Sequence, residues 1–82
     1  MTISKENLET IIKVDNKVKN ILMQGGSEIM LLTELHADMP DIKKVIEDPS
    51  PEKDKYCRQY DGFYKYMKIL ENLAGGIANL KL

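Results

Sequence analysis

The chain has little of what short proteins use to reinforce a fold. Its 82 residues include one cysteine, one histidine and no tryptophan. A single cysteine cannot form an internal disulfide, and there is no cluster of cysteine and histidine to hold a structural metal. A core of this size typically contributes only about 3–5 kcal/mol, so many such chains gain stability from a partner subunit. We therefore predict a homodimer.

Long apolar runs are also missing. Residues 1–6 lack the apolar core of a signal peptide. No segment reaches the length of about 20 apolar residues that a transmembrane helix requires. A lone Cys57 without an export signal fits a reducing compartment. We expect a cytoplasmic protein with no membrane partner.

Motifs that bind nucleotides, metals or substrates are absent as well. The two glycine pairs, Gly25-Gly26 and Gly75-Gly76, lack the flanking residues of a phosphate-binding loop or a dinucleotide fold. Both pairs are interpreted as helix ends. The sequence therefore predicts a protein that is not an enzyme and that has no cofactor and no metal.

The two residues best suited to chemistry stand alone. His36 has Glu34 and Asp38 nearby, but this spacing does not place three side chains on one face of a helix. No nucleophile is suggested for the histidine to activate. Arg58 and a helix N-terminus could lower the pKa of Cys57, yet no resolving cysteine accompanies it. We interpret both residues as structural.

Turn signals divide the chain into four helical segments. Residues 1–82 are therefore predicted to form one all-α domain, a small helical bundle with two long and two short helices. Ser4 is suited to cap the first long helix, and Gly25-Gly26 to end it. The apolar residues of this helix recur at helical spacing: Leu8, Ile11, Val14, Val18, Ile21 and Leu22.

Charged residues of the first helix predict ion pairs and an edge of the buried face. Glu9 with Lys13, and Asp15 with Lys19, are acid-before-base pairs four residues apart. Asp15 lies close to the apolar stripe. It either marks the edge of the buried face, which we favour, or acts as a polar group that sets the packing register.

The middle segment is expected to form two short helices. Ser27 is suited to cap the first of them, and Pro40 either stops it or lies in the first turn of the next helix. The second is expected over residues 41–47. The apolar side of the first helix is predicted to consist of Ile29, Leu32, Leu35, His36 and Met39, and that of the second of Ile42, Val45 and Ile46.

The last segment predicts a second long helix. Ser50-Pro51-Glu52 has the pattern of an N-cap, a proline at the first helical position and an acid in the first turn. The helix should run from Pro51 to about Leu73. Gly75-Gly76 should end or weaken it, and the apolar tail over residues 77–82 should dock on the domain.

All five aromatic residues fall within residues 56–66 of this helix. An apolar series with steps of four and three places its members on one side: Tyr56, Tyr60, Phe63, Met67, Leu70, Ala74 and Ile77. Tyr64 and Tyr66 lie on the shoulders of that side. Gly62, in mid-helix, either lets another backbone approach or marks a kink beside Asp61. The predicted partner-binding residues are Tyr56, Tyr60, Phe63, Tyr64 and Met67.

Three functions compete for this surface. The leading hypothesis is a small non-catalytic interaction or regulatory module, acting as a homodimer and binding an unknown protein. The first alternative is a nucleic-acid-associated regulator that uses Lys55, Arg58, Lys65 and Lys68. Most of these bases fall behind the aromatic side, and residues 27–52 carry two lysines against seven acids. Nucleic acid is therefore the weaker hypothesis. The second alternative is a carrier of a small ligand.

Overall fold

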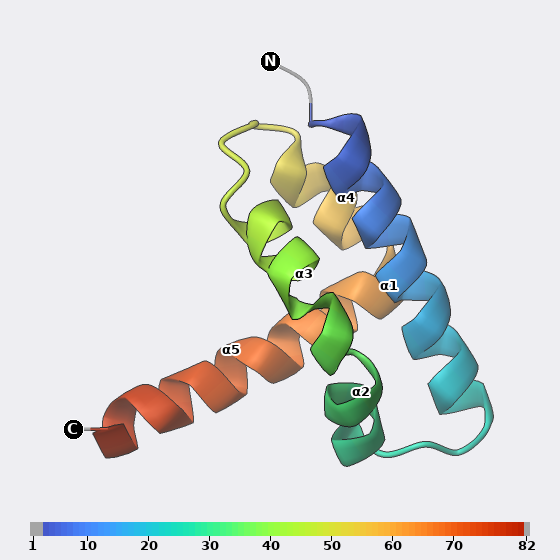
Figure 1. Ribbon diagram of the computed structural model, residues 1–82, viewed down its shortest axis with the longest axis vertical. Coiled ribbons are helices and arrows are strands. Elements are labelled where there is room, and N and C mark those ends of the chain that lie inside the picture. The colour runs from blue at the N-terminus through green and yellow to red at the C-terminus, as the bar shows by residue number, and fades with distance from the viewer. Residues whose placement is uncertain (1–2, 82) are drawn as a thin grey trace.

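The computed structural model describes residues 3–81, with side chains as far as residue 72 (Figure 1). The described residues contain no strand, which confirms the all-α fold. Five α-helices and one 3-10 helix follow in the order α1 (Lys5–Met23), α2 (Glu28–Glu34), η1 (His36–Asp38), α3 (Met39–Ile46), α4 (Lys53–Gln59) and α5 (Asp61–Lys81).

Helix α1 begins and ends where the sequence predicts. The Ser4 hydroxyl accepts a hydrogen bond from the N–H of Asn7 at 3.1 Å, and Gly25 adopts a φ of 79° after the last turn. Only glycine takes this left-handed conformation without strain. The helix packs against α3 and α5. Its wholly buried apolar residues are Ile11, Val14 and Val18.

The segment α2–η1–α3 buries a different stripe from the predicted one. Ile29 is 74% exposed and His36 is exposed, so placing them on the inner side was wrong. Pro40 lies in the first turn of α3, where its missing N–H leaves no helical hydrogen bond unmade. The buried stripe has steps of four and three and continues through all three elements: Leu31, Leu35, Asp38, Ile42 and Val45.

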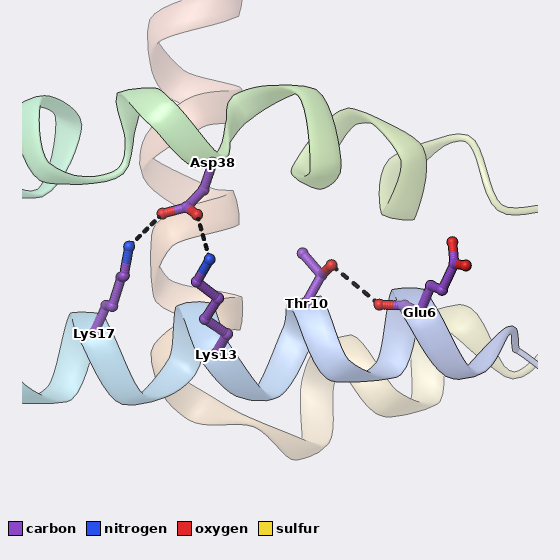
Figure 2. Close-up of polar contacts among 5 residues, drawn as sticks. All are labelled: Glu6, Thr10, Lys13, Lys17 and Asp38. Atoms are coloured by element: carbon purple, nitrogen blue, oxygen red, sulfur yellow. Dashed lines mark hydrogen bonds and ion pairs between the residues drawn. The ribbon is translucent and has the colours of Figure 1, made fainter.

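An acidic residue can belong to that stripe because α1 supplies two cations (Figure 2). The Asp38 carboxylate, 7% exposed, receives Lys17 Nζ at 2.7 Å and Lys13 Nζ at 3.1 Å. The hydrogen bond from Lys17 is the main reason why the pKa of Asp38 lies below its ordinary value. Lys13 therefore pairs with Asp38, and the predicted pair with Glu9 does not form.

The loop between α3 and α4 is tied to the start of α1. Asp48 accepts a hydrogen bond from the side-chain amide of Asn7 at 2.6 Å and another from the N–H of Ser50 at 2.7 Å. These two bonds lower the pKa of the Asp48 carboxyl, the bond from Asn7 having the larger effect. The Ser50 hydroxyl accepts from the N–H of Glu52, but α4 begins only at Lys53. The predicted helix start at Pro51 is therefore two residues early.

The second long helix is broken at Tyr60, contrary to the prediction of one helix from Pro51 to about Leu73. Tyr60 is extended, with φ −100° and ψ 97°, and α5 begins at the next residue. Figure 1 shows α4 and α5 running in different directions. Both interpretations of Gly62 are confirmed. The helix is interrupted beside Asp61, and the backbone of Asp15 approaches Gly62 closely.

Asp15 stabilises the break from inside the fold. Its carboxylate accepts a hydrogen bond from the N–H of Gly62 at 2.7 Å and forms the predicted ion pair with Lys19 at 3.0 Å. The residue is only 3% exposed, so the favoured interpretation as an edge residue was wrong. A buried carboxylate needs such partners, since its desolvation is otherwise costly.

Helix α5 supplies the aromatic part of the core. Phe63 and Tyr66 are buried against α1 and the middle segment, and the Tyr66 hydroxyl donates to Met39 Sδ at 3.5 Å. Burial, and to a lesser degree the charge of Asp38, raises the pKa of Tyr66. The helix continues through Gly75-Gly76, so this pair does not end it. The predicted docking of the tail concerns side chains outside the described residues, as do the predicted positions of Ala74 and Ile77.

None of the described helices combines the length and apolar character needed to span a bilayer.

Candidate functional site

The five predicted partner-binding residues divide between the core and the surface. Phe63 is wholly buried, so it contacts this chain's own core rather than a partner. Tyr56, Tyr60 and Met67 are half-buried and pack against the core. Tyr64 is 40% exposed. Tyr64 is therefore the most accessible member of the set, and Tyr56, Tyr60 and Met67 are accessible in part.

The difference in burial between Tyr64 and Tyr66 follows from the break at Tyr60. In a continuous helix both would lie on the shoulders of the apolar side. Because α5 starts anew at Asp61, its buried face is set by contact with α1, and that face carries Phe63, Tyr66 and Ile69. Tyr66 is 1% exposed and Tyr64 faces solvent. Sequence spacing within one helix holds no signal for this change.

A groove of about 240 Å³ lies where α4 and α5 meet the end of α3. We call it the α4–α5 groove. Its apolar lining residues come from three helices, α3, α4 and α5. Its other lining residues are charged. The lining consists of Ile46, Lys53, Asp54, Cys57, Arg58, Tyr64, Met67, Lys68 and Glu71.

Two of the three cations of the α4–α5 groove already have acidic neighbours. Lys53 Nζ donates to the carbonyl oxygen of Ile46 at 3.0 Å and lies 3.8 Å from the Asp54 carboxylate. Lys68 Nζ lies 3.5 Å from the Glu71 carboxylate and 5.4 Å from the centre of the Tyr64 ring. Glu71, followed by Tyr64, raises the pKa of Lys68.

Arg58 is the third cation of the groove. It is exposed, and among the side chains described, residues 3–72, no acid lies within ion-pair distance of it. A guanidinium offers five N–H donors and is suited to bind a carboxylate through two of them. The groove thus combines an accessible tyrosine, a methionine and an arginine, residue types that are enriched in protein–protein interfaces.

Cys57 lies at the floor of the same groove. Burial raises the pKa of its thiol, and the nearby Lys53 offsets this only in part. The thiol is therefore kept protonated at neutral pH, which opposes a nucleophilic role. The lowered pKa that the neighbouring Arg58 suggested in the sequence is not found.

His36 lies away from the α4–α5 groove. It is exposed beside Leu32 and Thr33, on a shallow part of the surface. Within the described residues, no three histidine, cysteine or acidic side chains are gathered so as to hold a metal ion. The histidine therefore has no partners there for metal binding.

A second apolar surface lies around the turn between α1 and α2, and the sequence analysis did not single it out. Met23 is 84% exposed, and Ile29 and Met30 are 74% and 46% exposed. Met30 also lines a shallow groove with Lys17, Asn20, Ile21, Gln24 and Glu34. Met23, two residues before Gly25, offered a signal, since a side chain beside a turn has fewer neighbours to pack against.

Comparisons with protein-family models, with curated proteins and with solved structures give no match for this chain.

Proposed function

We propose that the protein is a small non-catalytic interaction module that binds a segment of another protein in the α4–α5 groove. One observation carries this proposal: Tyr64 and Ile46, which both line the groove, remain 40% and 43% exposed, and Arg58 in the same lining has no acid within ion-pair distance among the described side chains. Exposed apolar groups beside an arginine are the arrangement from which energetically dominant interface contacts are built.

The groove defines the chemistry of the partner segment. Its floor accepts an apolar side chain over Cys57 and Met67, and Arg58 accepts a carboxylate next to it. Lys53 and Lys68 contribute less attraction, since Asp54 and Glu71 already neutralise them. The expected ligand is therefore an apolar segment of a protein with an aspartate or glutamate close to its apolar anchor.

The homodimer remains a prediction of the sequence. Phe63, one of the predicted partner-binding residues, is buried inside one chain, as is Tyr66. Tyr64 and Met67 are the members of the aromatic helix that a second copy can reach without a change of fold.

Photo-crosslinking tests the binding proposal. A photoreactive residue replaces Tyr64 in one variant and exposed Glu9 on α1 in another, and both are irradiated in extract of the native cell. The proposal expects a discrete adduct from position 64 and none of the same mass from position 9. An identical adduct pattern from both positions would exclude the groove as the binding site.

A charge reversal then tests the expected role of Arg58. Arg58→Glu should abolish the adduct formed at position 64. Lys43→Glu makes the same change of charge on exposed α3, outside the groove, and should leave the adduct intact. Equal capture by the two variants would contradict an acidic contact at Arg58, and unchanged capture by an additional Met67→Asp variant would contradict the groove itself.

One observation favours nucleic-acid binding as the second candidate. Contrary to the segregation expected from the sequence, Arg58 and Lys68 share the groove with Tyr64, an arrangement that stacks bases and neutralises phosphates. Asp54 and Glu71 line the same groove and repel phosphate. Binding to generic single-stranded DNA that weakens with salt and is lost in Arg58→Glu would support this candidate, and no binding at low salt would end it.

A small-ligand carrier has less support. The volume of about 240 Å³ is below the roughly 300–1,000 Å³ of typical ligand sites, and His36 is not among the lining residues. An absorbance spectrum of the freshly purified protein tests for a bound chromophore.

A further inference from the structure

No proline causes the break between α4 and α5, although Gly62 lies two residues after Tyr60. Residues 53–81 contain no proline, and the only positive φ in the described residues belongs to Gly25. Tyr60 alone leaves the helical conformation. Backbone hydrogen bonds continue on both sides of it, from the N–H of Tyr60 to the carbonyl oxygen of Tyr56 at 3.3 Å and from the N–H of Tyr64 to that of Tyr60 at 2.9 Å. Rotation about a few backbone bonds at Tyr60 would join α4 and α5 into one continuous helix.

Contacts with α1 hold the break in place. The Asp15 carboxylate accepts from the N–H of Gly62, one of the first N–H groups of α5, which have no acceptor within their own helix. A Cβ at position 62 would lie 2.6 Å from Asp15 Oδ1 and 2.7 Å from the Asp15 carbonyl oxygen. The bent form therefore uses the carboxylate at position 15 as its acceptor, and the packing of α5 on α1 requires the absence of a side chain at position 62.

Straightening the junction would remove α5 from its own bundle. The first N–H groups of α5 would then bond to carbonyl oxygens of α4, so the acceptor on Asp15 would no longer be needed. The cost would be the exposure of Phe63 and Tyr66, which are now 0% and 1% exposed. The surface that covers these rings is formed by α1 and the middle segment, and every copy of the chain carries the same surface.

We propose that the α4–α5 junction is a hinge through which two copies of this chain exchange α5. In the exchanged dimer each α4–α5 pair is one continuous helix. The α5 of one copy packs on α1 of the other and makes there the contacts that it makes within the single chain. Exchange of an identical element is a route to a dimer that needs no new interface. It explains how a homodimer uses the aromatic helix although its rings are buried in one chain.

Two single substitutions bias the hinge in opposite directions, and a third is a control. Gly62→Ala is the control: it introduces the two close contacts with Asp15 wherever α5 packs on α1, in the single chain and in the exchanged dimer alike, so it should not raise the dimer fraction. Asp15→Ala removes the acceptor on which the bent form depends. Asp61→Pro does the reverse: proline is tolerated at the first position of α5 after an extended Tyr60, and it breaks a continuous helix.

Light scattering coupled to size exclusion tests the hinge. After refolding at high micromolar concentration, the dimer fraction should rise with concentration in the unsubstituted chain. The dissociation constant should fall about tenfold or more in Asp15→Ala but not in Gly62→Ala, and Asp61→Pro should stay a monomer. A mass of one chain for the folded unsubstituted chain and for folded Asp15→Ala, or an equal dimer fraction in Asp61→Pro, overturns the proposal.

Spin-label distances distinguish exchange from face-to-face association. In a Cys57→Ser background, one population carries a label at exposed Asn16 on α1 and a second population carries it at exposed Lys65 on α5. The two are unfolded together and refolded as a mixture. Exchange gives an intermolecular distance equal to the intramolecular distance in a doubly labelled monomer of Asp61→Pro. A dimer with a different intermolecular distance refutes exchange.

Discussion

The Asp15 carboxylate, in the middle of α1, serves as the cap of α5 by accepting the N–H of Gly62 at 2.7 Å. Helix caps usually come from the residue directly before the helix, but that residue here is Tyr60, which has no suitable side-chain acceptor close to its backbone. A negative charge at this point is also favoured by the positive end of the α5 dipole. This contact is one of those that join the two long helices of the bundle, and it lies where the second begins.

Removal of the cap should destabilise the single chain. We expect Asp15→Ala to lower the free energy of unfolding by about 1–3 kcal/mol, the cost of leaving a buried donor without an acceptor. Urea unfolding at low micromolar concentration measures it. Lys19→Ala is the matched control, since Lys19 is 53% exposed and its ion pair with Asp15 should contribute less than about 1 kcal/mol. Equal losses in the two variants would contradict the capping role.

Truncation of two adjacent rings, Phe63 and Tyr64, should distinguish a core position of α5 from a surface position. Phe63→Ala should cost about 3–5 kcal/mol of unfolding free energy, because the ring is wholly buried. Tyr64→Ala should cost less than about 1 kcal/mol, since the ring is 40% exposed. Thermal and urea unfolding of the two variants provide the comparison. A larger loss at position 64 would show that the register of α5 is wrong.

Acid should weaken the contact between α1 and η1. The pKa of Asp38 in the folded chain lies below its ordinary value of 3.8. The unfolded chain therefore binds more protons between these two values. The stabilisation from Asp38 is complete above about pH 3.8 and is lost as the pH falls through the lowered pKa. Urea midpoints measured from pH 6 to pH 2.5 should decline over this window.

Two substitutions test whether the loss of the Asp38 charge causes this decline of the urea midpoint. Asp38→Asn should make it shallower, because the amide has no proton to gain, and should lower the midpoint at pH 6, because Lys13 and Lys17 lose their partner. Asp41→Asn changes an exposed acid in the neighbouring α3 and should leave the slope as it is. A slope unaffected by Asp38→Asn would refute the assignment.

The thiol of Cys57 should react slowly in the folded chain. Burial raises its pKa above the ordinary value of 9.0, so little thiolate is present at pH 7. Modification by an aromatic disulfide reagent should be at least about tenfold slower than in urea-unfolded chain, given that the thiolate is the reacting form. Asn16→Cys in a Cys57→Ser background provides an exposed thiol as control. A Cys57 rate equal to that control would contradict the buried position.

Local sequence signals located most helix starts and turns. Ser4 and Ser27 accept the expected N–H groups, and Gly25 closes α1. These predictions succeed because a cap or a left-handed turn depends on residues within about four positions of each other. The sequence did not predict the α4–α5 groove: Tyr64 and Met67 were named as partner-binding residues, and Ile46, which comes from a different helix, was not placed with them.

The errors share one cause. Periodicity gives the faces of a helix, but which face is buried depends on what the rest of the chain brings to it. Asp38 lies on a buried face because Lys13 and Lys17 meet it there, whereas the sequence placed His36 on the inner side. Tyr64 and Tyr66 were both placed on the shoulders of the apolar side, but Tyr66 lies in the core and Tyr64 on the surface because α5 starts anew at Asp61 and packs on α1.

The sequence by itself determined an all-α chain, the caps and ends of α1 and the positions of the main turns, since these follow from contacts between near neighbours. Only the tertiary structure decided that α4 and α5 are separate helices, which of their rings are buried, and that a groove forms between them. The reason is that a helix without an internal breaker bends only where contacts across the fold outweigh the hydrogen bonds that continuity would provide. In this chain those contacts come from Asp15, 47 residues before Gly62.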